Sequence, residues 1–300
     1  MGLGFRAMPL CFLVFYITTT MKIAFQGRHG AYSESAAFHL FGKNIETVPI
    51  DTFEDLHKTV QNKEVSYGVI PIENSTAGSV LENYDLLLKY RLPIIAEVKL
   101  QIDHCLIALK SEKIETLTRV ISHPQALEQC SGFFESHPQI ERKPFFDTAG
   151  SVERIARKQL KGAGGIASAF AAEFYGLAVL KSPLANFPGS NSTRFFAIQK
   201  EPIPIDPVLH TKTSIAFIAG KNVPGALHAC LGCFAKQGVD LIRIESRPKS
   251  GSPWEYVFYA DLAGNPLQKP VELALQELKT MAEVILLGSY ARGENKGVEF

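Results

Sequence analysis

Apolar and polar residues alternate in short blocks along the chain from residue 21 onwards. Short apolar runs indicate strands, and each is followed by a segment that has apolar residues at helical spacing. In the first part of the chain, strands and helices are expected in turn at 23–25, 33–41, 48–50, 52–60, 67–70 and 80–90. Ser33 and Thr52 are expected to cap the first two helices. This alternation predicts a parallel sheet with helices on its faces.

The pattern then changes before it resumes. Two extended segments, 94–98 and 104–109, follow with little helix between them, and we interpret them as crossovers into a second lobe. Beyond them, strands and helices are expected at 120–121, 124–134, 143–146, 151–160, 165–167, 169–175, 178–180 and 194–198. Two α/β lobes joined by crossovers enclose a cleft, and such clefts are common ligand sites.

A proline-rich segment at 201–207 indicates a domain boundary. After it, the pattern predicts a strand, a helix, two strands, a helix and a strand at 213–218, 225–236, 241–245, 256–262, 271–281 and 284–287. This β-α-β-β-α-β order is that of the ferredoxin-like unit. We therefore divide the chain into an apolar extension, a two-lobed domain, a linker and a C-terminal domain, with bounds 1–20, 21–200, 201–212 and 213–290.

The composition is that of an ordinary globular protein, with 46% apolar residues, 20% charged residues and a formal net charge of +1. The length of 300 residues suits roughly two domains. Because phosphate binding needs clustered lysine and arginine, this charge balance gives no electrostatic case for nucleic acid or an anionic membrane. The expected partner is a small molecule.

The N-terminal extension, 1–20, carries Arg6 and an apolar run, 8–17, that is too short to span a bilayer. Three interpretations stay open: a translation start at Met21, a signal or membrane anchor, and a remnant of another targeting segment. We expect a cytoplasmic protein, with a plastid or exported location as the alternative if this extension is a targeting segment.

The chain has five cysteines, a small and odd number that argues against a disulfide framework and for a reducing compartment. Cys230 and Cys233 form a Cys-x-x-Cys pair with His228 nearby, but no second pair of ligands follows at zinc spacing. We therefore expect no metal site.

Four short polar segments flank predicted strands, at 73–76, 122–125, 147–150 and 191–194. We place all four at the carboxyl ends of strands, the edge where open α/β sheets bind ligands and where helix N-termini attract anions. A ligand that carries carboxylates suits such an edge. Each segment also has a purely structural interpretation, for example Ser122 and Asp147 as helix caps, or 191–194 as an ordinary turn.

The chain lacks the glycine-rich dinucleotide motif, the P-loop, the zinc protease motif and the nucleophile elbow of hydrolases. We therefore expect no organic cofactor.

Taken together, the ordered motifs resemble those of the prephenate dehydratase family, which includes the arogenate dehydratases. The resemblance covers nearly everything from residue 21 to about 287. It rests on Gly27-x-x-Gly-Ala-Tyr-Ser33, Pro71-Ile-Glu-Asn-Ser75, Ser122-His-Pro-Gln-Ala-Leu-Glu-Gln-Cys130, Asp147-Thr-Ala-Gly150, Ala167-Ser-x-x-Ala-Ala-x-x-Tyr-Gly176 and Asn191-Ser-Thr-Arg-Phe195. The C-terminal part resembles the family's regulatory ACT domain at 224–227 and 244–248.

The resemblance implies a two-lobed catalytic domain similar to type 2 periplasmic binding proteins, followed by a ferredoxin-like ACT domain. It implies a lyase that removes the ring carboxylate and the 4-hydroxyl of prephenate together, giving phenylpyruvate, carbon dioxide and water on the route to phenylalanine. No cofactor is implied, since aromatisation of the ring drives the reaction.

The resemblance also implies roles for particular residues. Thr193 matches the family's catalytic threonine, and we expect it to donate a hydrogen bond to the leaving hydroxyl. The other expected catalytic residues are Asn74, Ser122, Gln129 and Glu73. The expected substrate-binding residues are Thr148, Arg194, Ser75 and Asn191. The expected residues for phenylalanine as feedback inhibitor are Gly225, Ala226, Leu227, Glu245, Ser246 and Arg247.

Several alternatives stay open. Arg28 stands where the family often has proline, and it adds a charge near the active-site turn. The substrate could be arogenate, whose side chain is amino rather than keto. A non-catalytic two-lobed sensor would use the same cleft without chemistry. The open edge of the C-terminal sheet predicts a homo-oligomer, either a dimer or a tetramer.

Overall fold

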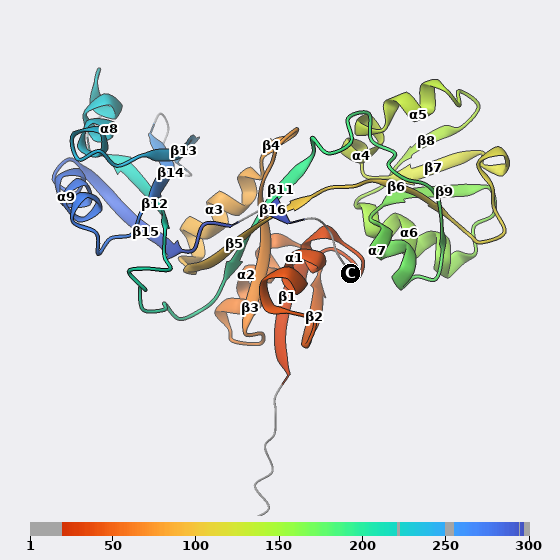
Figure 1. Cartoon of the computed structure of the whole chain (residues 1–300), viewed down its shortest axis with the longest axis horizontal. Helices are drawn as coiled ribbons and strands as arrows, with labels where there is room; N and C mark the ends of the chain where they lie inside the picture. The colour runs from red at the N-terminus through yellow and green to blue at the C-terminus, as the bar shows by residue number, and fades with distance from the viewer. Residues whose placement is uncertain (1–19, 221–222, 250–254, 294, 297–300) are drawn as a thin grey trace, which may run out of the picture.

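Two α/β lobes and a C-terminal domain lie in a row in the computed structural model, with the first lobe in the middle (Figure 1). The structure describes residues 20–220, 223–249, 255–293 and 295–296. Nearly all of the N-terminal extension, 1–19, therefore lies outside the described residues. Within them, no helix combines the length and the apolar character needed to cross a membrane.

The first lobe follows the predicted alternation of strands and helices. It comprises β1 (Met21–Gln26), α1 (Tyr32–Phe41), β2 (Ile45–Ile50), α2 (Phe53–Gln61), β3 (Tyr67–Asn74), β4 (Gly78–Ser79), α3 (Leu81–Tyr90), β5 (Ile94–Gln101) and β11 (Ser192–Ile198). The predicted cap of α2 is confirmed, because the Thr52 side chain accepts from the backbone N–H of Asp55. The predicted cap of α1 is wrong. Ala31 precedes that helix, and Ser33 lies inside its first turn because the Ala31 carbonyl already accepts the first helical hydrogen bonds.

The second lobe carries a separate sheet in the order β10-β6-β9-β7-β8. Its elements are β6 (Cys105–Ala108), a 3₁₀ turn (Ile114–Thr116), β7 (Arg119–Ser122), α4 (Pro124–Gln129), α5 (Ser131–Glu135), β8 (Glu141–Pro144), α6 (Thr148–Lys158), β9 (Ala163–Ala167), α7 (Ala169–Phe174) and β10 (Ala178–Lys181). The single helix expected at 124–134 is interrupted at Cys130. There, Asn186 Oδ1 accepts from the backbone N–H of Gly132, which competes with helical pairing.

The chain crosses between the lobes twice, through 102–104 and through 182–191. The first crossover confirms the interpretation of the two extended segments, because β5 belongs to the first lobe and β6 to the second.

The C-terminal domain has the predicted β-α-β-β-α-β order. Its elements are β12 (Lys212–Ala219), α8 (Ala226–Lys236), β13 (Leu241–Pro248), β14 (Tyr256–Ala263), α9 (Lys269–Leu278) and β15 (Ala282–Tyr290), with β16 (Asn295–Lys296) returning to pair with β5. Cys230 and Cys233 are buried in its core beside Phe234 and Leu278.

One sheet extends through the C-terminal domain and the first lobe, in the order β13-β14-β12-β15-β5-β11-β3-β1-β2. The two parts meet where Gly288 of β15 pairs with Ile94 of β5. A Cβ atom at position 288 would clash with the Ile94 carbonyl oxygen, so glycine allows this close approach. One core cluster continues across the junction, where Tyr84 and Leu87 of α3 belong with Tyr259. The C-terminal domain is thus packed directly behind the strands that carry Asn74 and Thr193.

Candidate active site

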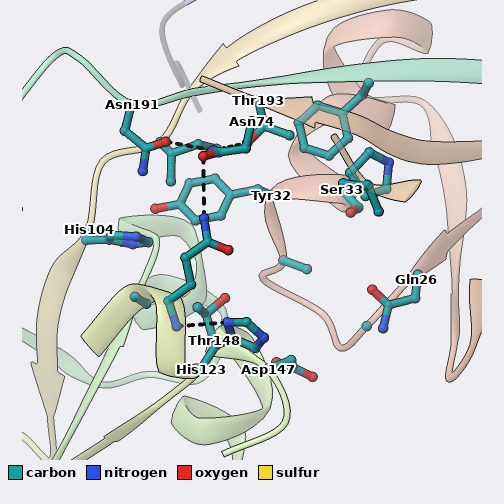
Figure 2. A pocket seen from close by; sticks show the side chains of 18 of the residues that line it. Gln26, Tyr32, Ser33, Asn74, His104, His123, Asp147, Thr148, Asn191 and Thr193 are labelled. Carbon is teal, nitrogen blue, oxygen red and sulfur yellow. Dashed lines mark hydrogen bonds between the residues drawn. The ribbon is translucent and has the colours of Figure 1, made fainter. Parts of the chain in front are cut away.

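A cavity of about 390 Å³ lies between the two lobes (Figure 2). Asn74, Asn191 and Thr193 lie on one side of it, and His123, Asp147 and Thr148 lie opposite. The further lining residues are Gln26, Gly27, Ala31, Tyr32, Ser33, Phe53, Pro71, Val80, Ile102, His104, Gln125, Ala126, Gln129, Phe146 and Phe195.

Thr193 and Asn74 face each other across an antiparallel pair of strands. In the register of β11 and β3, Thr193 is the partner of Asn74. The segment 191–194 therefore lies at the amino end of a strand, and the expectation of a carboxyl end was wrong for it. It still reaches the cavity, because the beginning of one antiparallel strand lies beside the end of its neighbour.

The Asn74 side chain has a fixed orientation. Its Oδ1 accepts from the backbone N–H groups of Thr76 at 3.0 Å and Ala77 at 2.9 Å. Its Nδ2 consequently donates to Thr193 Oγ1 at 2.9 Å and to Asn191 Oδ1 at 2.7 Å. Thr193 Oγ1 thus accepts from Asn74, and its own hydrogen can point into the cavity.

Gln129 brings the second lobe to this group. Its Nε2 donates to Thr76 Oγ1 at 2.6 Å, and its Oε1 accepts from Asn191 Nδ2 at 3.0 Å. Thr76 Oγ1 donates in turn to Asn74 Oδ1 at 2.7 Å. These hydrogen bonds join α4 to the end of β3 and to the beginning of β11, so contact between the lobes assembles the site.

The groups of the cavity that can attract an anion are backbone N–H groups rather than lysine or arginine side chains. No lysine or arginine is among the described residues that line the cavity. The lining instead includes the first residues of α1 and α6, Tyr32 and Thr148, where unpaired N–H groups and the helix dipole favour an anion. Asp147 caps α6 by accepting from the backbone N–H of Gly150, and burial raises the pKa of its carboxyl.

Four of the expected site residues are not among those that line the cavity. Glu73 and Arg194 directly neighbour Asn74 and Thr193 in their strands, so they point to the opposite face. The guanidinium of Arg194 is buried against Asp261 of the C-terminal domain at 2.6 Å, and Glu73 lies 3.1 Å from Arg243.

The other two hold the backbone. Ser75 Oγ donates to the Ser190 carbonyl and accepts from the Ser192 N–H, both at 2.9 Å, which fixes the turn before β11. The fully buried hydroxyl of Ser122 donates to the Ile166 carbonyl at 2.7 Å and ties β7 to β9. The structure therefore brings together Thr193, Asn74, Gln129, Thr148 and Asn191.

Two residues of the network were missed by the sequence reasoning, Thr76 and His104. Thr76 lies within a polar segment that the sequence singles out, but nothing in the sequence shows that it reaches Gln129. His104 is a lone histidine before an apolar strand, a pattern that carries no functional signal.

Arg28 does not line the main cavity. It forms ion pairs with Asp51 at 2.7 Å and with Glu153 of the second lobe at 3.6 Å. Arg28 therefore links the two lobes through ion pairs that lie outside the cavity.

The expected effector residues fall into two groups. Gly225, Ala226 and Leu227 line a cavity of about 380 Å³ at the beginning of α8. Glu245, Ser246 and Arg247 lie in β13 and are not among its lining residues. Glu245 Oε2 accepts from Ser79 Oγ at 2.7 Å, and Arg247 pairs with Asp85 of α3. Among the described residues of one chain, the second group is thus not part of the cavity that the first group lines.

A family model described as prephenate dehydratase matches residues 23–203, which contain both lobes and the whole cavity. The chain belongs to the prephenate dehydratase family. It is 41% identical over 285 residues to arogenate dehydratase 2 of Petunia hybrida, which covers 90% of this chain and 71% of the relative. It is 34% identical over 274 residues to the bifunctional chorismate mutase/prephenate dehydratase of Pseudomonas aeruginosa, over 91% of this chain and 73% of the relative.

Solved structures give the same result for the fold. Prephenate dehydratase from Arthrobacter aurescens in complex with L-Phe superposes with a TM-score of 0.82 at 28% identity, over 91% of this chain and 90% of that one. GqqA, described as a novel type of quorum quenching acylase, superposes with a TM-score of 0.83 at 31% identity, over 91% of this chain and 98% of that one. The prephenate dehydratase fold thus includes both lobes and the C-terminal domain.

Proposed function

We propose that this member of the prephenate dehydratase family converts prephenate to phenylpyruvate, with Thr193 as the hydrogen-bond donor to the leaving hydroxyl. The observation that carries the proposal is the fixed Asn74 amide, which makes Thr193 Oγ1 an acceptor and leaves its hydrogen for the substrate.

The reaction needs few protein groups. The bond between the ring and its carboxylate breaks, the electron pair moves through the ring, and the bond to the 4-hydroxyl breaks. The departing hydroxide takes up one proton from solution and leaves as water. Thr193 stabilises the charge that develops on this oxygen. The N-termini of α1 and α6, with Thr148, hold the carboxylates. Asn191 accepts from Asn74 Nδ2, and Gln129 links this pair to the second lobe.

Arogenate is the second candidate substrate, because the Petunia relative at 41% identity is an arogenate dehydratase. The test is release of phenylpyruvate from prephenate and of phenylalanine from arogenate by the purified chain. The ratio of kcat/KM values decides between the two substrates. Binding of either substrate without turnover would instead support a non-catalytic sensor.

The C-terminal domain is proposed to be an ACT domain that binds phenylalanine as a feedback inhibitor. Its β-α-β-β-α-β order and the cavity beside Gly225 support this, as does the Arthrobacter structure with L-Phe. Because Glu245 and Arg247 lie away from that cavity, a second copy of the chain would have to supply them. β13 forms the edge of the sheet and offers a surface for such pairing. Sedimentation with and without phenylalanine tests both the dimer or tetramer and the effector.

A reducing compartment, cytoplasm or plastid, is the proposed location. The four cysteines of the described residues are free and buried. Arogenate dehydratase 3 of Arabidopsis thaliana, 38% identical over 288 residues, is described as chloroplastic. Imaging of the tagged full chain in its own cells would decide between the two compartments.

A further inference from the structure

His104 is a buried histidine that lines the cavity beside Tyr32 (Figure 2). Only 3% of its surface is exposed, and its ring meets the Tyr32 ring edge-on at 6.0 Å. Its Nε2 lies 2.9 Å from Gln129 Oε1, while its Nδ1 has no hydrogen-bond partner among the described residues. The ring thus makes one directed polar contact, and that contact is to a site residue.

The direction of this contact follows from the backbone at the end of β3. The N–H groups of Thr76 and Ala77 fix Asn74 Oδ1 as an acceptor, so Asn74 Nδ2 donates to Asn191 Oδ1. The other end of Asn191, its Nδ2, therefore faces Gln129 and donates to its Oε1. Gln129 Oε1 is consequently an acceptor.

A group that contacts Gln129 Oε1 must donate to it, so His104 carries its proton on Nε2. Burial lowers the pKa of His104, which keeps the ring neutral with a bare Nδ1. With Oε1 held by His104 and Asn191, Gln129 Nε2 points at Thr76 Oγ1 at 2.6 Å. If the Gln129 amide were flipped, its Nε2–H₂ group would face the N–H groups of both His104 and Asn191.

We propose that His104 is a positioning residue that holds the Gln129 amide in one orientation and thereby keeps the second lobe hydrogen-bonded to Thr76 and Asn191 beside Thr193. It acts through Gln129 and the two residues that Gln129 contacts, Thr76 and Asn191. The inference rests on the proposed function, in which the Thr193 hydroxyl must point at the substrate. Because Gln129 comes from the second lobe, His104 also fixes the contact by which the lobes complete the site.

Two amide substitutions test this proposal. A glutamine amide nitrogen can take the place of the histidine Nε2, whereas an asparagine amide nitrogen takes the place of Nδ1. His104→Gln therefore keeps the donor to Gln129, and His104→Asn removes it. We expect kcat to fall about tenfold or more in His104→Asn with KM within about threefold, and both constants to stay within about threefold in His104→Gln. Equal kcat values in the two variants would overturn the proposal.

A matched control separates positioning from stability. His57 is also fully buried, but it lies in α2, bonds the Phe53 carbonyl and is not among the cavity residues. His57→Phe should lower the thermal midpoint without lowering kcat. The kcat values of His104→Asn and His57→Phe are compared at equal thermal midpoint. If His104→Asn loses no more kcat than His57→Phe, His104 only stabilises the fold.

The imidazole nitrogen spectrum of the wild-type chain gives a readout that does not depend on turnover. The Nε2–H tautomer of His104 is expected, with its proton hydrogen-bonded, and the Nδ1–H tautomer would overturn the inference. If wild type turns over neither prephenate nor arogenate, the proposed function fails and the catalytic consequence of His104 fails with it. If wild type is active and the two amide variants match it, the inference about His104 alone fails.

Discussion

At the scale of single residues, the Asn74 amide decides what the Thr193 hydroxyl can do. A threonine hydroxyl is a weak acid and can either accept or donate. Since Asn74 Nδ2 donates to Thr193 Oγ1, the hydroxyl hydrogen is left for a group in the cavity. Backbone N–H groups that no side-chain movement can remove hold this arrangement.

Asn74→Asp should reverse this polarity. The new carboxylate would still accept from the backbone N–H groups, but its other oxygen would take the hydrogen of Thr193 and turn it away from the substrate. We expect kcat to fall about 100-fold or more while the fold is kept. Steady-state kinetics of Asn74→Asp beside Asn62→Asp, which adds the same charge at an exposed position, is the measurement. Equal rates in the two variants would contradict this role.

The residues of the site were partly predictable. Thr193, Asn74 and Gln129 lie in motifs whose order along the chain is distinctive, and they do line the cavity. Arg194 was expected there as well, although consecutive residues of a strand face opposite sides, so Thr193 and Arg194 could not both do so. Thr76 and His104 could not be found, because their contacts depend on how the second lobe meets the first.

At the scale of elements, the spacing of apolar residues and the capping residues predicted most strands and helices. The Thr52 cap was found because it is local, and the interruption at Cys130 was missed because Asn186, far along the chain, causes it. The continuation of one sheet from the first lobe into the C-terminal domain was not predictable. It depends on the pairing of Gly288 with Ile94, residues that no short-range pattern connects.

Helix α2 makes the stability of the chain depend on pH. His57 is buried in this helix, with Nδ1 donating to the Phe53 carbonyl at 2.8 Å. Burial lowers the pKa of His57 from 6.5 to about 4. The unfolded chain therefore takes up this proton first as the pH falls below 6.5, and the folded state loses stability between pH 6.5 and about 4.

The shift predicts a loss of about 2 kcal/mol of unfolding free energy from this group between pH 6.5 and 5, at 1.36 kcal/mol per unit. Urea unfolding at pH 7 and pH 5 measures it. His57→Phe should be less stable at pH 7 but should lose less on acidification. An unchanged pH dependence in that variant would contradict the assignment.

At the scale of the whole molecule, the C-terminal domain is tied to the back of the catalytic strands by buried charges. Arg194 lies 2.6 Å from Asp261, and Lys212 lies 2.8 Å from Glu97 and 3.3 Å from Asp261. All four residues are buried. Burial would raise the pKa of Asp261, but Arg194 and Lys212 outweigh it and hold that pKa below its usual value.

Asp261→Asn should cost about 3–5 kcal/mol of unfolding free energy, because it removes the buried carboxylate that lies 2.6 Å from Arg194. The other carboxylates near Arg194, those of Glu97 and Glu73, lie 3.9 and 3.8 Å away. The double variant Arg194→Met with Asp261→Leu removes one charge of each sign and leaves Lys212 with Glu97. It should recover most of that loss. Urea unfolding of the three proteins measures both effects. A double variant no more stable than Asp261→Asn would show that the pair is not the source of the loss.

The proposal that Thr193 donates to the leaving hydroxyl is tested most directly by comparing Thr193→Val with Thr193→Ser in steady-state turnover of prephenate and arogenate. Valine keeps the shape of threonine without the hydroxyl, and serine keeps the hydroxyl. The account predicts that Thr193→Val lowers kcat on the preferred substrate by about 100-fold or more with little change in KM, while Thr193→Ser stays within about tenfold of wild type. A Thr193→Val protein with the kcat of wild type would contradict it.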